Sequence, residues 1–359
     1  MNTTAPPTEP VSIGMLEPKV GFIKKLLKAQ AFQILLVLIV IVLIFSSLAP
    51  DTFAQWSNFR LIIQNASILA VLGVGMTFVI ITAGIDLSIG SVLVFSGVVS
   101  AITMRALGGE GWGVAIIGIV VSILAGTAWG FVNGFLIAKG KIPPLIVTLG
   151  SFGMALGLAL ILTGGINIRE VPAVLTSSIG YGNVLGTIPL ISVIALVIVL
   201  LGAFLLHYTR FGLYTFAVGS SEVAARRVGV KVDRHLIYVY MLTGGLAGVA
   251  GILSLSQFST TAIAGQSETN LNVIAAVVIG GTSLFGGIGT IFGTVVGLFI
   301  PAVLQNGFVI TGVQPFWQQV AVGVVLITAV YIDQVRRSAS MRGKSPSLWR
   351  KLVSGGRRE

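Results

Sequence analysis

The chain has 359 residues, of which 9% are charged, and a mean hydropathy of +1.01 excludes a soluble globular domain. It has no cysteine, which excludes disulfides and thiolate metal sites. Its formal charge of +11 indicates basic loops on the cytoplasmic side of a membrane rather than nucleic-acid binding. The composition predicts an all-α, polytopic transmembrane helical bundle.

The N-terminal residues 1–30 are polar and then basic, which is typical of a cytoplasmic tail at a membrane surface. The first apolar run follows at 31–48. Residues 47–49 resemble a signal-peptidase site, but the run and its leader are longer than those of a usual signal peptide, which favours an uncleaved helix. We expect a transmembrane domain over 31–334 and a basic cytoplasmic tail over 335–359.

Ten apolar runs, each near the roughly 20 residues that a bilayer requires, predict about ten membrane spans. They lie at 31–48, 61–83, 87–107, 113–138, 143–163, 189–207, 235–257, 271–284, 287–309 and 316–332. The run at 271–284 is too short to span unless it is extended or broken. Residues 85–90 could be an interruption inside the membrane rather than a loop.

The basic residues follow the positive-inside rule if the N-terminus is cytoplasmic. Ten crossings then place nineteen of the twenty-two Lys and Arg residues inside and leave Arg60, Arg105 and Arg169 outside. An inverted chain would reverse this ratio. We therefore expect both termini and a central loop at 209–234 to be cytoplasmic, and the longest outer segment to be 164–188.

The central loop at 209–234 is the longest polar interval between two apolar runs. Its middle predicts a short helix in which either Ser220 or Ser221 suits the N-cap. Glu222 suits the first turn, and the following arginines and Gly229 suit the end. Two interpretations stay open at this point: a helix that docks a soluble partner, or a solvated loop on anionic headgroups.

The two halves of the chain contain similar interrupted segments. The stretches 83–90 and 280–287 each place a glycine-bounded polar break between an apolar helix and a Gly-rich helix. Paired breaks of this kind point to the central pathway of a transporter, because broken backbone at membrane depth needs protein or water to satisfy it. Close packing through small residues is the alternative, since the chain has 46 glycines.

Asp86 lies in the first break. A carboxylate at membrane depth is costly and usually has a functional or structural partner. Asp86 could cap the following helix by accepting N–H bonds from Ser88 or Ile89, which we favour, or it could contact a substrate directly.

The chain lacks the usual motifs of an enzyme. It has no P-loop and no H-E-x-x-H motif, and its spans carry too few acidic residues for an obvious proton or sodium relay. A transporter of this kind would receive its energy through another protein, which favours a docking role for the central loop.

Five long stretches, in this order, resemble the permease subunits of bacterial ABC importers of the ribose/xylose/galactose branched-permease family. They are GMTFVIITAGIDLSIGS (75–91), GFVNGFLIAKGKIPPLIVTLGS (130–151), TRFGLYTFAVGSSEVAARRVGV (209–230), LNVIAAVVIGGTSLFGGIGTIFGTVVG (271–297) and FWQQVAVGVVLITAVYID (316–333). The resemblance extends over nearly the whole chain.

The resemblance implies a type II-like ABC importer permease of the bacterial cytoplasmic (inner) membrane. It implies a homodimeric or heterodimeric pore, cytoplasmic ATPase subunits on the central loops and a periplasmic or lipid-anchored sugar-binding protein outside. The chain itself would hold no cofactor or metal and no nucleic acid, because the partner ATPase would bind ATP and Mg²⁺. The residues of the coupling helix would be Ser221, Glu222, Ala224, Ala225, Arg226, Arg227 and Gly229. The small residues among them would let the helix seat closely in an ATPase groove.

Six side chains are candidates for the translocation pathway. The polar groups of Asp86, Ser88, Thr282 and Ser283 could hydrogen-bond a passing sugar, and a structural role for them is at least as compatible with the sequence. The aromatic rings of Phe78 and Phe95 could contact a sugar ring, although packing between helices is the more common role of such residues.

Three departures from the family pattern bear on the substrate: Leu213 stands where arginine is common, Ser221 where asparagine is common and Asn270 where glutamate is frequent. The expected substrate is a monosaccharide such as ribose, xylose or galactose, or a related polyol. Relatives also carry autoinducer-2 and nucleosides. The rival interpretations are a secondary transporter of a small polar solute and a membrane anchor or sensor.

Overall fold

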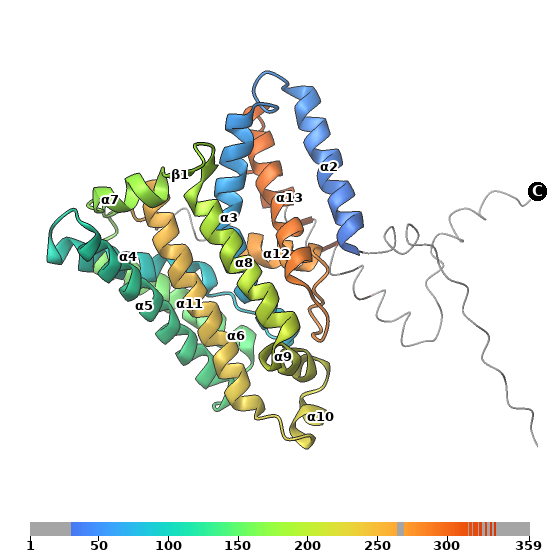
Figure 1. Ribbon diagram of the computed structural model, residues 1–359. Coiled ribbons are helices and arrows are strands. Elements are labelled where there is room, and N and C mark those ends of the chain that lie inside the picture. The colour runs from blue at the N-terminus through green and yellow to red at the C-terminus, as the bar shows by residue number, and fades with distance from the viewer. Residues whose placement is uncertain are drawn as a thin grey trace, which may run out of the picture.

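The computed structural model describes residues 30–263, residues 269–314 and scattered positions from 316 to 334. These residues form a helical bundle with one short antiparallel hairpin, in which β1 (Asn183–Val184) pairs with β2 (Ile188–Pro189) (Figure 1). The helical class predicted from the sequence is therefore correct. The predicted tails at 1–30 and 335–359 lie outside the described residues, apart from the first residue of the first described helix.

In the part of the chain that the structure describes, seven helices are long and apolar enough to cross a membrane. They are α3 (Trp56–Ile81), α4 (Ile89–Leu107), α5 (Trp112–Ala138), α6 (Pro144–Thr163), α8 (Leu190–Tyr208), α11 (Val232–Phe258) and α13 (Ile291–Ile310). Each matches one predicted span with shifts of a few residues at its ends. The chain is thus a multi-pass membrane protein by the length and composition of its helices.

The other three predicted spans have different outcomes. The first belongs to α2 (Gln30–Leu48), which contains a shorter apolar stretch from Phe32 to Leu48. The run at 271–284 folds as α12 (Thr269–Ile279), whose 11 residues extend about 16 Å and so cross only about half of a bilayer core. The run at 316–332 is described only in part, and its described residues are helical. The number of ten crossings stays a prediction.

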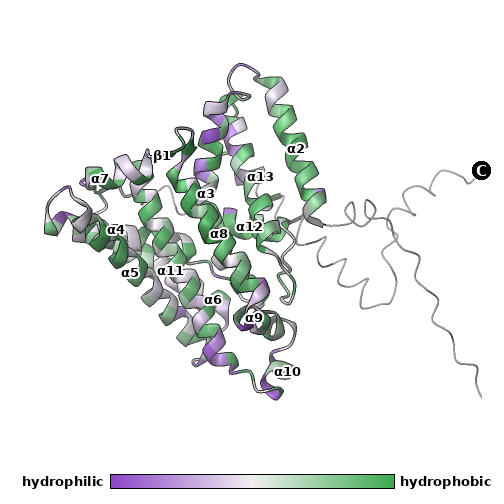
Figure 2. Cartoon of the chain, in the orientation of Figure 1, coloured by the Kyte–Doolittle hydropathy of each residue, from purple (hydrophilic) through white to green (hydrophobic). Residues whose placement is uncertain are grey.

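The centre of the bundle is formed by α3 and α11. Helix α3 is buried along most of its length, and α11 crosses it and packs closely on α5. A Cβ atom added at Gly244 of α11 would lie 2.2 Å from the carbonyl oxygen of Gly126 of α5, so only glycine allows these two backbones to approach. In contrast, α5, α6 and α8 expose many apolar side chains, as expected where a helix faces lipid or another subunit (Figure 2).

The loops gather at the two ends of the bundle. One end carries α7 (Ala173–Leu175), the π-helical turn η1 (Thr176–Gly180) and the β-hairpin, and the other carries α9 (Arg210–Ser220) and α10 (Glu222–Arg227) (Figure 1). The end with α9 and α10 also contains the connection between α5 and α6. The structure therefore brings together the loops that the positive-inside rule assigns to the same side. The cytoplasmic placement of that side and of the termini stays a prediction.

Candidate functional site

The predicted short helix of the central loop is present as α10, and both of its ends are capped. The Oγ atom of Ser221 accepts a hydrogen bond of 3.2 Å from the N–H of Ala224, so the N-cap is Ser221 and not Ser220. At the other end, the N–H of Gly229 donates to Arg226 and that of Val230 donates to Ala225, which is a Schellman motif. The φ of Gly229 is +87°, a conformation that favours glycine. The helix is therefore a defined element.

One residue of α10, Ala225, faces the interior of the protein rather than the surface. Ala225 was expected to meet an ATPase groove, but its side chain is 3% exposed and packs inside the chain against Val218 and Val232. Ala225 therefore lies on the face of α10 that packs against α9 and α11. The outward apolar surface comes instead from Val223, which is 63% exposed, and Val228, which is 79% exposed. The sequence analysis did not consider these two valines.

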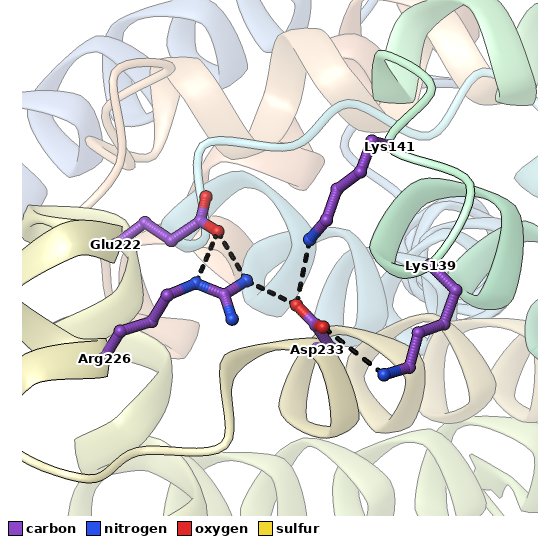
Figure 3. A network of polar contacts seen from close by, with 5 residues as sticks. All are labelled: Lys139, Lys141, Glu222, Arg226 and Asp233. Atoms are coloured by element: carbon purple, nitrogen blue, oxygen red, sulfur yellow. Dashed lines mark hydrogen bonds and ion pairs between the residues drawn. The ribbon is translucent and has the colours of Figure 1, made fainter.

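Charged groups hold α10 against two other elements (Figure 3). Arg226 pairs with Glu222 at 2.8 Å and also with Asp233 at the start of α11. Asp233 in turn accepts from Lys141 at 3.0 Å and from Lys139 at 3.4 Å, both in the connection between α5 and α6. The carboxylates of Asp233 and Glu222 raise the pKa of the Arg226 guanidinium above its ordinary value. Glu222 and Arg226 are thus engaged within the chain, whereas Ala224 and Arg227 are exposed.

Helix α9, which precedes α10, was not expected from the sequence. Residues 209–234 resemble a polar loop with one short helix, yet Arg210–Ser220 is helical and Thr209 caps it by accepting from the N–H of Gly212 at 3.4 Å. Thr209 before an apolar run was the available signal. The consequence is that α10 is connected to the bundle through a second helix rather than through a loose segment.

The C-terminal end of α9 contacts both helix breaks. A Cβ atom at Gly219 would lie 1.7 Å from the carbonyl oxygen of Ile81, the last residue of α3, and 2.7 Å from the N–H nitrogen of Gly287. Gly287 donates to the same Ile81 oxygen at 2.9 Å. The start of the first break, the second break and the end of α9 therefore meet at one backbone junction, formed by Ile81, Gly219 and Gly287.

The first break extends from Thr82 to Ser88, between α3 and α4. Asp86 is 4% exposed, and its Oδ1 atom accepts from the N–H of Ser88 at 2.8 Å and from the Oγ of Ser88 at 2.6 Å. The hydrogen bond from the N–H of Ser88 is the one that the sequence suggested, and it forms an Asx turn just before the helix. Asp86 itself is not the cap, because the N-cap residue of α4 is Ser88. In this conformation the Oδ1 atom of Asp86 accepts two hydrogen bonds from within the chain.

A series of hydrogen-bonded side chains, which were not candidates from the sequence, continues from Ser88 into α5 and α6. The Nδ2 of Asn133 in α5 donates to the Oγ of Ser88 at 2.9 Å, and the Oγ of Ser151 in α6 donates to the Oδ1 of Asn133. All three side chains are at most 1% exposed. Asn133 and Ser151 lie within the stretch 130–151, and a lone Asn in an apolar span was the signal that could have identified them.

The first break also meets the start of α12. The Nδ2 of Asn270 donates to the carbonyl oxygen of Leu87 at 2.8 Å, so the N-terminal ends of α4 and α12 lie together inside the protein. The Oδ1 of Asn270 is buried and has no hydrogen-bond partner among the described residues. Asn270 was noted from the sequence only as a departure from the family pattern.

The remaining pathway candidates do not gather around Asp86. Thr282 and Ser283 lie in the second break, at the opposite end of α12 from Asn270 and close to the backbone junction. Asp86 does not form one polar centre with Thr282 and Ser283. The two breaks meet at the backbone junction, but Asp86 lies toward the far end of the first break, where Leu87 contacts the start of α12. Phe78 has no exposed surface and packs on Phe211 with ring centroids 5.7 Å apart.

Phe95 is the second aromatic candidate. It is partly exposed, and its ring centroid lies 5.0 Å from that of Trp129 on α5. Both aromatic candidates therefore pack between helices in this conformation, which is the role that the sequence favoured for them.

Comparisons of the sequence with known proteins identify its relatives. A family model described as a branched-chain amino acid transport system / permease component matches residues 58–330. The ribose import permease protein RbsC of Escherichia coli (strain K12) is 36% identical over 310 residues, which cover 84% of this chain and 93% of that protein. The fructose import permease protein FrcC of Rhizobium meliloti is 33% identical over 316 residues, covering 85% of this chain and 86% of FrcC.

The D-allose transport system permease protein AlsC of Escherichia coli (strain K12) is 34% identical over 304 residues, which cover 83% of this chain and 90% of AlsC. No solved structure matches the chain. The family match includes both helix breaks, the backbone junction and α10. The chain therefore belongs to the family of branched-chain-type transport system permease components.

Proposed function

We propose that this chain is the membrane-embedded permease subunit of an ATP-driven ABC importer for a monosaccharide or a related polyol, in the bacterial cytoplasmic membrane. The observation that carries the proposal is α10, a capped helix that presents exposed apolar side chains at the end of a permease bundle. The similar permeases are named for ribose, fructose and allose, which supports a sugar as the substrate. The proposed substrate is a ribose-like sugar, xylose or galactose, or a related polyol.

The energy would come from a cytoplasmic ATPase subunit that docks on α10. Val223, Val228 and Ala224 supply an exposed surface of small and apolar groups, and Ser221 and Arg227 lie beside them. ATP and Mg²⁺ would be bound by that partner and not by this chain. A sugar-binding protein would dock at the opposite end, and two permease chains, identical or different, would form the pore.

The backbone junction would transmit movement of α10 to the membrane-embedded breaks. Ala225 and the ion pairs of Asp233 attach α10 firmly, so α10, α9 and the start of α11 would move as a unit. Gly219 at the end of α9 touches the end of α3 and the second break without an intervening side chain. Because closely packed interfaces shift between discrete arrangements, a displacement of α9 would change the conformation of both breaks.

The substrate would pass near the first break. Asp86, Ser88, Asn133 and Asn270 bring carboxylate, hydroxyl and amide groups together inside the bundle, and a sugar hydroxyl could exchange hydrogen bonds with them when the pathway opens. Thr282 and Ser283 would act closer to the junction with α9.

The test is a co-purification of the full-length tagged chain in mild detergent, followed by mass spectrometry and an ATPase assay. We expect an ATPase subunit whose turnover rises when a sugar-loaded binding protein is added, and the ligand of that binding protein identifies the substrate. If no ATPase is recovered under conditions that preserve a control importer, and the chain alone transports sugar in liposomes, the chain is a secondary transporter and the proposal is wrong.

A further inference from the structure

A pocket of about 460 Å³ lies between α9 and α11, on the end of the bundle that carries α10. Four of the side chains that line it are aromatic and two are basic, and the α10–α11 connection closes it. The lining residues are Phe211, Tyr214, Gly229, Val230, Lys231, Arg234, His235 and Tyr238. The lining meets the end of α10 at Gly229, next to Val228, so the pocket borders the surface that we assign to the ATPase.

The aromatic wall of this pocket is held in place by His235. The His235 ring lies 4.7 Å from the Phe211 ring and 6.1 Å, edge to face, from the Tyr214 ring. Its Nε2 atom is 3.0 Å from the Oγ1 of Thr215, and His235 is 5% exposed. These contacts join α9 to α11, so the aromatic wall is built by the fold.

The charges of the pocket are not neutralised within the described part of the chain. Lys231 and Arg234 are exposed, no carboxylate lines the pocket, and no ion pair to either residue is found among the described residues. The neighbouring carboxylate, Asp233, is already engaged by Lys139, Lys141 and Arg226. The pocket therefore offers two free cations to a ligand with negative charge.

The pocket lies at a boundary between apolar and polar surface. Hydrophilic residues gather around α10 and the start of α11, and apolar residues continue along α8 and α5 (Figure 2). Tyr238 is 55% exposed, and at its level α5 packs on α11 through Gly134, whose neighbour Phe135 is 48% exposed. Tyrosine rings beside lysine and arginine, at the edge of an apolar face, are typical of the level of lipid headgroups.

We propose that this pocket binds the headgroup of an anionic phospholipid. Lys231 and Arg234 pair with its phosphate groups, while Tyr214 and Tyr238 contact the glycerol backbone and the first part of the acyl chains. Lys and Arg side chains clustered beside the end of a transmembrane helix attract anionic headgroups at the cytoplasmic surface. The position of the aromatic half of the lining at the edge of the apolar face favours a lipid over a protein partner, because a lipid presents charge and hydrocarbon within a few ångströms of each other.

The test measures binding of short-chain phosphatidylglycerol to the purified full-length chain in detergent, by native mass spectrometry and by the shift in melting temperature. We expect Arg234→Gln to weaken binding about fivefold and Lys231→Gln/Arg234→Gln about 30-fold, since each cation near an anionic surface contributes a similar factor. Arg227→Gln, the matched control on α10, changes the net charge equally and should weaken binding less than twofold. Short-chain phosphatidylcholine should bind all four proteins weakly and equally.

Three results would overturn the proposal. If Arg227→Gln weakens binding as much as Arg234→Gln, the lipid is attracted by the overall positive charge at the α10 end of the bundle and not by the pocket. If inorganic phosphate produces the same thermal shift as phosphatidylglycerol, the ligand is a free anion. If the double variant keeps its lipid but loses association with the ATPase, the pocket is a protein contact. The melting temperature of each lipid-free variant reports whether it is folded.

Discussion

Gly219 of α9 lies directly against the carbonyl oxygen of Ile81 at the end of α3: a Cβ atom at position 219 would be 1.7 Å from that oxygen. The same oxygen accepts a hydrogen bond of 2.9 Å from Gly287 in the second break. Three segments that are far apart in the sequence therefore share one backbone group. This contact connects α9, which precedes the surface assigned to the ATPase, directly to the interior of the bundle.

A methyl group at this junction should disrupt transport. We expect Gly219→Ala to force the end of α9 away from Ile81, to cost about 1–3 kcal/mol of stability as overpacking does, and to reduce ATP-driven uptake at least tenfold. Uptake in cells and the melting temperature of the purified chain measure the two effects. Binding of the ATPase should persist, since α10 is untouched.

The matched control is Gly150→Ala on α6, where a Cβ atom would meet nothing within 4 Å. It should leave both uptake and the melting temperature unchanged. If Gly219→Ala transports as well as this control, α9 is not the element that couples α10 to the helix breaks.

The exposed valines of α10 should be required for docking. We expect Val228→Glu to prevent recovery of the ATPase and to abolish uptake while the chain still inserts and keeps its melting temperature, because Val228 is 79% exposed. Ala225→Glu should act differently: it places a charge in the small apolar cluster with Val218 and Val232 and should lower the melting temperature. Normal recovery of the ATPase with Val228→Glu would exclude this face as the docking surface.

The role of Asp86 can be separated into charge and hydrogen bonding. Asp86→Asn retains an oxygen that accepts from the N–H and the hydroxyl of Ser88, so we expect it to fold normally. Asp86→Ala leaves these buried donors without their acceptor and should cost about 1–3 kcal/mol. Thermal unfolding in detergent compares the two variants with the wild-type chain. A folded Asp86→Asn protein that has lost uptake would show that the carboxylate charge is needed for transport.

The ion pairs of Asp233 should protect the central loop from proteolysis. We expect Asp233→Asn to accelerate tryptic cleavage after Arg226 and Arg227 several-fold, because α10 loses its attachment to α11 and to Lys141. The melting temperature should change little, since exposed ion pairs contribute about 0.2–1 kcal/mol each. High salt should accelerate cleavage of the wild-type loop in the same direction.

The control for this experiment is Glu170→Gln, which breaks the exposed pair of Glu170 with Arg105 at the other end of the bundle. Cleavage of the central loop should be unaffected by it. Equal cleavage of Asp233→Asn and wild type would mean that packing of Ala225 alone holds α10.

Local sequence patterns predicted several elements correctly. The cap formed by Ser221, the glycine end of α10 and the turn at Asp86 and Ser88 each depend on residues within a few positions of one another. Such short-range hydrogen bonds are encoded by the order of residue types. The helix α9 was missed although Thr209 caps it, because its polar ends made the whole interval resemble a loop.

Two other errors have a common physical origin, since each concerns contacts between distant segments. Ala225 faces Val218 and Val232 because α9 and α11 lie beside α10, a placement that no local pattern contains. The two breaks looked equivalent in sequence, but the first runs from the backbone junction to the start of α12, whereas the second lies at the end of α12 beside α9.

The sequence by itself determined the membrane-embedded helical class, the family and the location of its interruptions, because hydropathy, capping and motif order are properties of neighbouring residues. Only the tertiary structure decided which groups meet: Gly219 with Ile81, Asn133 with Ser88, and Asn270 with Leu87. These contacts join segments between about 45 and 183 positions apart. Close backbone approach and buried hydrogen bonding depend on how whole helices cross, which the order of residues along any one helix does not specify.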